Sequence, residues 1–175
     1  MGVRLEDGCT IWFTGLPSAG KTTLARALAA RLSGIGHPVE LLDGDEIRTH
    51  LARDLGFSRT DRTENVRRVG YVAQLLSRNG IVAVCALISP YREDRDAVRA
   101  LHDGRFVEVH VMAPVSVCVE RDVKGLYARQ RAGQLHGLTG IDDPYEAPLA
   151  ADVVVMTDRQ TPEQSLEVIW QALRG

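Results

Sequence analysis

An eight-residue motif near the N-terminus constrains this chain more than any other feature of its sequence. Residues 15–22 read GLPSAGKT and fit the pattern G-x-x-x-x-G-K-[ST]. A short β-branched and aromatic segment precedes the motif, and a segment with apolar residues at helical spacing follows it. Glycines let the backbone curl around a phosphate, and the N-terminus of the following helix directs its positive end to the same point. This order predicts a nucleotide-binding α/β core.

The motif also predicts roles for single residues. Lys21 is placed to reach the β- and γ-phosphates of ATP, and the hydroxyl of Thr22 to complete the coordination shell of Mg²⁺. The predicted ATP site consists of Gly15, Leu16, Pro17, Ser18, Ala19, Gly20, Lys21, Thr22 and Thr23. A glycine-rich turn that matches by chance is the alternative interpretation, and the flanking strand and helix favour the phosphate loop.

Length and composition limit the class of protein. With 175 residues, 45% of them apolar and 25% charged, the chain is expected to form a single domain over residues 1–175. A formal net charge of −2 leaves no basic excess for binding nucleic acid. Three widely separated cysteines, Cys9, Cys85 and Cys118, indicate reduced thiols, not a disulfide framework or a zinc site. Without an apolar signal segment or membrane span, we expect a cytoplasmic protein.

Short β-branched segments alternate with helical patterns along the chain, which is typical of an α/β fold with a mostly parallel sheet. We therefore predict the three-layer fold of P-loop nucleoside triphosphate hydrolases and kinases. The expected strands cover residues 9–14, 39–42, 81–88, 106–112 and 152–156. The last helix is expected to have Thr161 as its N-cap and Pro162 at its first position.

One segment, residues 124–148, interrupts this alternation. It contains four glycines, two prolines and the cations Lys124, Arg129 and Arg131. A long irregular segment inside a compact domain is more often functional than a plain connector. We interpret it as a mobile lid that keeps water from the γ-phosphate during transfer. A solvated surface loop is the alternative.

Charged residues after the second expected strand predict a site for the phosphoryl acceptor. The carboxyl edge of a parallel sheet is where such folds bind ligands. Asp45 there can orient or deprotonate an attacking hydroxyl, and Asp43 can help to position Mg²⁺ through water. Alternatively, Asp45 only caps a helix that begins at Glu46. Farther along, Arg48 and Arg62 offer planar guanidinium groups that suit phosphate or sulfate oxygens.

Taken together, these segments resemble the adenylyl-sulfate kinases, which phosphorylate the 3′-hydroxyl of adenosine 5′-phosphosulfate. The matching segments are GLPSAGKTT (15–23), LLDGDEIR (41–48), DLGFSRTDRTENVRRVG (54–70), ISPYREDRD (88–96), ERDVKGLYARQRAG (120–133) and LTGIDDPYEAP (138–148). Many enzymes share the phosphate loop, but the combination of segments in this order is specific and extends from about residue 8 to the C-terminus. The resemblance implies ATP with Mg²⁺ as donor, adenosine 5′-phosphosulfate as acceptor, and a homodimer.

The resemblance also implies roles at single positions. The implied acceptor-site residues are Asp45, Arg48, Phe57, Arg62, Asn65, Ile88, Ser89, Lys124, Gly137 and Leu138. Phe57 is expected to stack on the adenine, and Lys124 to lie near the transferred phosphate. The candidate catalytic residues are Lys21, Asp45 and Ser89, the last because it matches a serine described in the family as a phosphoenzyme site. Since direct in-line transfer needs no covalent intermediate, we expect Ser89 to bond substrate or backbone instead.

Leu138 departs from the family pattern, which commonly has an aromatic residue here that closes the adenine site opposite Phe57. Stacking of a base on an aromatic ring contributes about 1–3 kcal/mol, and leucine offers only the apolar part of that contact. A kinase for another small hydroxyl acceptor therefore stays open. A non-catalytic nucleotide-binding module is the other alternative. The intact Lys21, Thr22 and Asp45 and the missing guanine-reading motif N-K-x-D argue against that module.

Overall fold

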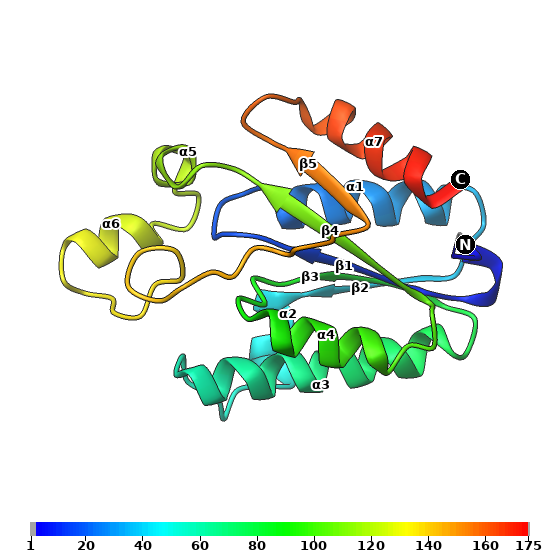
Figure 1. The fold of residues 1–175 in the computed structure, drawn as a ribbon, viewed down its shortest axis with the longest axis horizontal. Helices are drawn as coiled ribbons and strands as arrows, with labels where there is room; N and C mark the ends of the chain where they lie inside the picture. Colours follow the sequence, from blue (N-terminus) through cyan, green and yellow to red (C-terminus); the bar gives the residue numbers. More distant parts are fainter. Residues whose placement is uncertain (1–2, 175) are drawn as a thin grey trace.

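A sheet of five parallel strands organises the protein (Figure 1). The structure is a computed structural model and describes residues 3–174. The strands are β1 (Thr10–Thr14), β2 (Val39–Asp43), β3 (Val82–Ala86), β4 (Phe106–Met112) and β5 (Val153–Met156). Their spatial order is β2-β3-β1-β4-β5. All five expected strands are therefore confirmed, with β3 shorter at both ends than the expected 81–88.

Helices cover both faces of this sheet, as the three-layer prediction requires (Figure 1). The long helices are α1 (Lys21–Gly34) and α7 (Pro162–Arg174) on one face, and α3 (Arg59–Ser77) and α4 (Arg92–Ala100) on the other. The shorter ones are α2 (Gly44–His50), α5 (Val115–Arg121), α6 (Leu126–Arg131) and a 3₁₀ turn, η1 (Leu5–Asp7). None of the helices within residues 3–174 has the length and apolar character needed to cross a bilayer.

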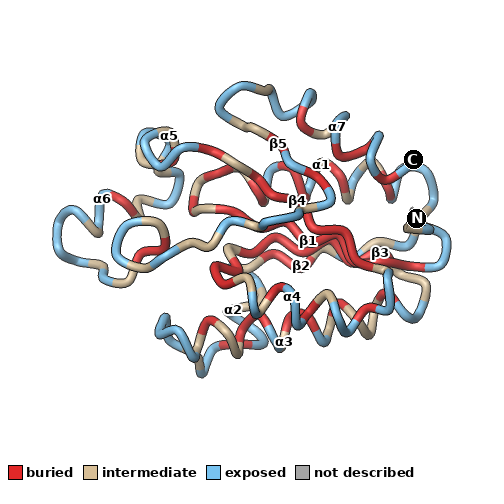
Figure 2. Tube along the Cα trace, in the orientation of Figure 1, coloured by how far each residue is buried: buried red, intermediate tan, exposed pale blue. Residues whose placement is uncertain are grey.

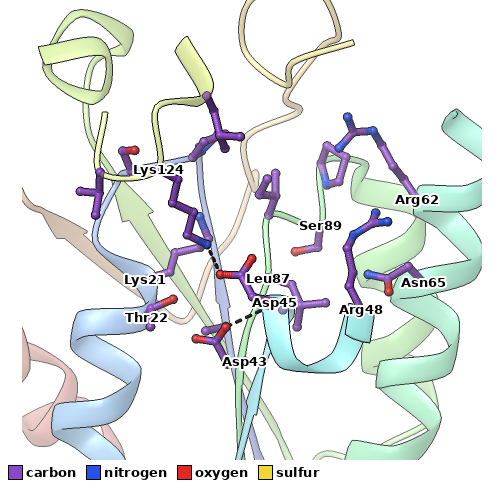
Figure 3. Close-up of a pocket in the computed structure, with 18 of the residues that line it drawn as sticks. Lys21, Thr22, Asp43, Asp45, Arg48, Arg62, Asn65, Leu87, Ser89 and Lys124 are labelled. Atoms are coloured by element: carbon purple, nitrogen blue, oxygen red, sulfur yellow. Dashed lines mark hydrogen bonds and ion pairs between the residues drawn. The ribbon is translucent and has the colours of Figure 1, made fainter. Parts of the chain in front are cut away.

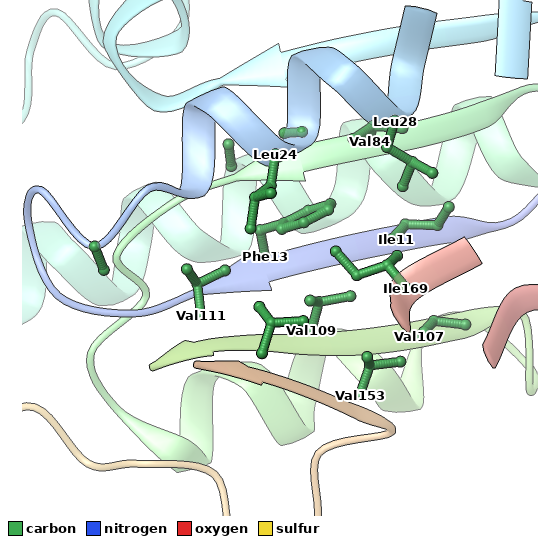
Figure 4. Close-up of a cluster of buried hydrophobic side chains, with 14 of the residues drawn as sticks. Ile11, Phe13, Leu24, Leu28, Val84, Val107, Val109, Val111, Val153 and Ile169 are labelled. Atoms are coloured by element: carbon green, nitrogen blue, oxygen red, sulfur yellow. The ribbon is translucent and has the colours of Figure 1, made fainter. Parts of the chain in front are cut away.

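The three central strands, β3, β1 and β4, are buried on both faces, which explains why their sequences lack clean alternation. Ile11 and Phe13 of β1 point toward α1 and α7 and pack with Leu24 of α1 (Figure 4). Trp12, the residue between them, points to the opposite face and packs with Val66 of α3. Figure 2 shows these central strands as buried along nearly their whole length, whereas the edge strands β2 and β5 are partly exposed.

Two local features fix the positions of helices: a close contact between α3 and α4, and the cap of α7. Gly70 lets α4 approach α3 closely, because a Cβ at that position would lie 2.5 Å from a methyl group of Val98. At the start of α7, the hydroxyl of Thr161 accepts from the backbone N–H of Gln164 at 3.2 Å, with Pro162 as the first helical residue. The predicted cap is thus confirmed.

The three cysteines are free and buried, which confirms the prediction of reduced thiols.

The segment 124–148 lies beyond the carboxyl ends of the strands, next to α5 (Figure 1). Its regular structure consists of α6 and one isolated bridge between Thr139 and Asp143. The prediction of a largely irregular segment at this place is confirmed. Its later part crosses back over the sheet and leads into β5.

Candidate active site

The phosphate loop forms between β1 and α1, and its two motif glycines are needed for different reasons. A Cβ on Gly15 would lie 2.4 Å from the carbonyl oxygen of Val111, so the loop passes β4 too closely for any side chain. Gly20 has a φ of 106° and is the N-cap of α1. Only glycine adopts that conformation readily. The loop therefore brings the N-terminus of a 14-residue helix to the site, where its free N–H groups favour phosphate oxygens.

A cavity of about 340 Å³ opens at the carboxyl edge of the sheet beside this loop (Figure 3). Lys21 and Thr22 lie on one side of the cavity, Arg48 and Asn65 on the opposite side, and Asp45 between them. The predicted site residues that line it are Pro17, Ser18, Gly20, Lys21, Thr22, Thr23, Asp45, Arg48, Phe57, Arg62, Asn65, Ile88, Ser89 and Lys124. One cavity thus joins the expected donor and acceptor sites.

Five predicted residues do not line the cavity: Gly15, Leu16, Ala19, Gly137 and Leu138. Three of them contribute backbone carbonyl oxygens to residues that do line it. Gly15 and Leu16 accept hydrogen bonds from Lys21, and Gly137 accepts one from Arg62.

Lys21 is turned toward its own loop in this structure. Its Nζ donates to the carbonyl oxygens of Gly15 at 3.0 Å and Leu16 at 2.7 Å. Burial, followed by the nearby charge of Lys124, lowers the pKa of Lys21 to about 7. The cation is therefore costly in the absence of an anion, and an arriving phosphate would stabilise it.

Asp43, and not Asp45, caps α2. The Oδ1 atom of Asp43 accepts from the backbone N–H of Asp45 at 3.0 Å, so the interpretation of Asp45 as the helix cap is wrong. The carboxylate of Asp45 is instead free of the backbone and pairs with Lys124 from the segment 124–148 (Figure 3). The second oxygen of Asp43, Oδ2, is buried without a hydrogen-bond partner at the cavity wall. A buried carboxylate oxygen in that state indicates a missing polar partner.

An aromatic ring and two guanidinium groups form the opposite wall. Phe57 is 56% exposed and lies 4.3 Å from the Cζ of Arg48 and 5.7 Å from that of Arg62, measured to the ring centroid. Arg48 donates to the carbonyl oxygens of Leu55 at 3.5 Å and Gly56 at 2.9 Å. Burial and then the charge of Arg62 lower the pKa of Arg48. The two guanidinium groups repel each other, so an anion bound between them would be stabilised by both charges.

Arg62 and Asn65 lie one turn apart on α3 and are both buried. Arg62 donates from Nε to the carbonyl oxygen of Phe57 at 2.9 Å and from Nη2 to that of Gly137 at 2.6 Å. The Oδ1 atom of Asn65 has no partner, although it faces the cavity. Arg68, one turn farther along, instead pairs with Asp54 at 2.7 Å. Of Arg62, Asn65 and Arg68, which follow one another at three-residue spacing on α3, only Arg62 and Asn65 therefore line the cavity.

Ser89 lines the cavity but its hydroxyl is already engaged. It accepts from Nε1 of Trp12 at 3.0 Å and donates to Oγ1 of Thr14 at 3.0 Å. Its partners here are two side chains of β1 and not the backbone, and a contact of Ser89 with substrate stays a prediction. The residue is buried and adopts a φ of 40°, which is unusual for a residue with a side chain.

Leu138 does not line the cavity that Phe57 lines, and its expected place opposite Phe57 across the adenine stays a prediction. Its side chain is 5% exposed and packs in the apolar cluster that includes Tyr127. The backbone holds it there, because the N–H of Leu138 donates to Asp142 at 3.1 Å and its carbonyl oxygen accepts from Ile141 at 3.0 Å. An apolar side chain gains free energy from that burial, which an open cavity wall does not provide.

Asp43, which was expected to position Mg²⁺ through water, also lines the cavity. The lining residues that had not been predicted are Gly44, Val66, Ala86, Leu87, Pro90, Val123 and Leu126. The apolar positions after β3 carry no chemical signal of their own. Their place at the carboxyl end of a central strand is the one sequence clue to their role.

Comparisons with known proteins agree with this geometry. The profile of the family described as Adenylylsulphate kinase matches residues 7–156. An adenylyl-sulfate kinase of Rippkaea orientalis is 54% identical over 168 residues, covering 96% of this chain and 92% of that protein. One from Microcystis aeruginosa is 52% identical with the same coverage. A solved structure described as the Mycobacterium tuberculosis APS kinase in complex with AMPPNP and APS has a TM-score of 0.90 and 42% identity, covering 96% of this chain and 98% of that one. The chain therefore belongs to the adenylylsulphate kinase family.

Proposed function

We propose that this enzyme transfers the γ-phosphoryl group of ATP to the 3′-hydroxyl of adenosine 5′-phosphosulfate, giving ADP and 3′-phosphoadenosine 5′-phosphosulfate. The observation that carries the proposal is the shared cavity, in which a phosphate loop faces an aromatic ring flanked by two guanidinium groups. The loop suits a triphosphate. The opposite wall suits a purine base and an anionic group.

On the donor side, the phosphates take over the hydrogen bonds that Lys21 makes to its own loop. Thr22 and Asp43 fit a hydrated Mg²⁺, because a hydroxyl lines the cavity beside a buried carboxylate oxygen without a partner. We propose that Thr22 contacts the ion directly and Asp43 through water. When bound with ATP, Mg²⁺ neutralises charge on the β- and γ-phosphates.

On the acceptor side, Phe57 provides a stacking face for adenine, and Arg48 and Arg62 hold the oxygens of the phosphosulfate group. The unpartnered Oδ1 of Asn65 is available to accept a hydrogen bond from the nucleotide. Asp45 lies between donor and acceptor walls, so we propose that it orients the 3′-hydroxyl and accepts its proton.

The transfer itself is proposed as a direct in-line displacement. The 3′-oxygen forms a bond to the γ-phosphorus, the bond from that phosphorus to the β–γ bridging oxygen breaks, and ADP leaves. Lys21 and Lys124 stabilise the charge on the moving group once Lys124 leaves Asp45. Ser89 takes no covalent part, since its hydroxyl is bonded to Trp12 and Thr14.

The segment 124–148 is proposed to act as a lid over this reaction. It contributes Lys124 to the cavity, and its Gly137 holds Arg62. A cover at this position would keep water from competing with the acceptor hydroxyl.

The assembly is proposed to be a homodimer, which sedimentation velocity on the purified protein tests.

A coupled assay of ADP release with four acceptors tests the proposed function. We expect turnover with adenosine 5′-phosphosulfate and none with gluconate or shikimate. AMP is the matched control, because it has the same adenosine and phosphate and lacks only the sulfate. Equal turnover with AMP or with a sugar acid would contradict the proposed acceptor, and rapid ADP release without any acceptor would contradict a transfer enzyme.

A further inference from the structure

A buried arginine outside the cavity joins three segments of the chain. Arg95 lies on α4 and is 2% exposed. Its Nε donates to Oε1 of Glu108 on β4 at 2.7 Å, its Nη1 to the carbonyl oxygen of Ser89 at 2.6 Å, and its Nη2 to the carbonyl oxygen of Glu146 at 2.7 Å. One planar guanidinium group therefore holds a strand, a cavity wall and the end of the segment 124–148.

The bond to Ser89 acts on the wall of the active site. Ile88, Ser89 and Pro90 follow β3 and all line the cavity. Ser89 has a φ of 40°, a conformation that persists only when neighbouring groups impose it. Arg95 holds its carbonyl oxygen, while Trp12 and Thr14 of β1 hold its hydroxyl.

The bond to Glu146 acts on the end of the proposed lid. The backbone N–H of Glu146 donates to the carbonyl oxygen of Pro90 at 2.8 Å, so the two segments also touch directly. Next to it, the hydroxyl of Tyr145 lies 3.0 Å from Oγ1 of Thr14. The same turn that forms the cavity wall is thus the anchor point of the lid.

We propose that Arg95, oriented by Glu108, is a positioning residue that fixes the cavity wall at residues 88–90 and the C-terminal anchor of the lid in one geometry. Stability alone does not account for the arrangement, because a buried ion pair is often no better than an apolar pair of similar volume. Two of the three hydrogen bonds of Arg95 also go to carbonyl oxygens at the site and not to Glu108. The proposal rests on the proposed function.

A double variant, Arg95→Met with Glu108→Leu, tests the role without leaving a buried charge unpaired. Arg99→Met is the matched control, because Arg99 lies 3.5 Å from the same Glu108 and pairs with Asp152, but has no hydrogen bond to Ser89 or Glu146. We expect the double variant to fold, to bind a non-hydrolysable ATP analogue normally, and to lose at least about tenfold in kcat/KM for adenosine 5′-phosphosulfate. The control should keep the wild-type value.

Arg95→Lys provides the conservative variant. Arg95→Lys retains a cation beside Glu108 but lacks the planar fork that reaches two carbonyl oxygens. It should therefore keep more of the wild-type thermal stability than of the wild-type kcat. Wild-type kinetics in a folded double variant, or in Arg95→Lys if the double variant does not fold, would overturn the proposal. Parallel losses of ATP affinity, acceptor affinity and stability would also overturn it, in favour of a purely structural role. A wild-type enzyme inactive on this acceptor would instead refute the proposed function.

Discussion

At the scale of the residue, we expect Lys21 to link protonation to nucleotide binding. Burial lowers its pKa to about 7 from the ordinary 10.5, so the charged form is disfavoured in the free folded protein. In the pH range between those two values the unfolded chain binds more protons than the folded one, and this group makes the free protein more stable as pH rises. A bound triphosphate reverses the preference, because it favours the cation.

We therefore expect ATP binding at pH 8 to take up as much as about one proton. Calorimetric titrations in buffers of different ionisation enthalpy measure the number, at a pH where the nucleotide itself is fully ionised. Lys21→Met is the control, and its binding should proceed without proton uptake. Equal uptake by the two proteins would show that another group titrates and that Lys21 is already charged in the free enzyme.

Ser89 gives a second prediction at this scale. Ser89→Ala removes the acceptor of Trp12 and one partner of Thr14, so the free energy of unfolding should fall by about 1–3 kcal/mol, while turnover stays substantial. Urea unfolding and steady-state assays measure both. Thr14→Val is the matched control, since it breaks the same chain of hydroxyls and leaves Ser89 in place. A loss of turnover confined to Ser89→Ala would restore the covalent route.

At the scale of the element, the segment 124–148, our proposed lid, contacts the surroundings of the cavity at several points. The hydroxyl of Tyr127 on α6 donates to the carbonyl oxygen of Pro17 in the phosphate loop at 3.1 Å. Lys124 pairs with Asp45 on α2, and Gly137 accepts from Arg62 on α3. The segment therefore contacts both the proposed donor side and the proposed acceptor side, as the proposed lid requires.

The position of Leu138 within this segment changes what its substitution is expected to do. Leu138→Phe adds volume to a packed apolar cluster and should lower the free energy of unfolding by about 1–3 kcal/mol without tightening acceptor binding. Leu138→Met conserves volume and should cost less, which makes it the control. Thermal unfolding and titration with adenosine 5′-phosphosulfate measure the two effects. Tighter acceptor binding at unchanged stability would show that Leu138 faces the base in the substrate complex.

The sequence predicted those elements whose signals are local. The phosphate loop, the five strands and the cap of α7 each depend on a few consecutive residues, and each is confirmed. The partners of Ser89 could not be predicted in the same way, because Trp12 and Thr14 lie 77 and 75 positions away and meet it only through strand pairing. A resemblance aligned Leu138 with an aromatic position but carried no information about which way its side chain points.

The start of α2 was predicted only in part. The segment 43–46 predicted a capped helix, but the cap is Asp43 and not Asp45, a shift of two positions. Such shifts are within the usual uncertainty of a helix start. The consequence is chemical, because the shift leaves the Asp45 carboxylate to pair with Lys124 and, in our proposal, to bind the acceptor hydroxyl.

At the scale of the whole molecule, strand order creates the cavity. β3 lies between β2 and β1, so the segments that follow these three strands meet at one edge of the sheet. They supply the phosphate loop, Asp43 with α2, and the wall at residues 88–90. The proposed donor and acceptor sites therefore face each other although their residues come from distant parts of the chain.

The most direct test of direct transfer between these sites is a rapid-mixing experiment with ATP labelled in its γ-phosphoryl group. With adenosine 5′-phosphosulfate present, we expect the label to pass to the nucleotide product in one step, to be released from it by a 3′-nucleotidase, and to be absent from the protein at every time point. Label that appears on the protein and leaves it at the turnover rate, or that resists the 3′-nucleotidase, would contradict in-line transfer to the 3′-hydroxyl.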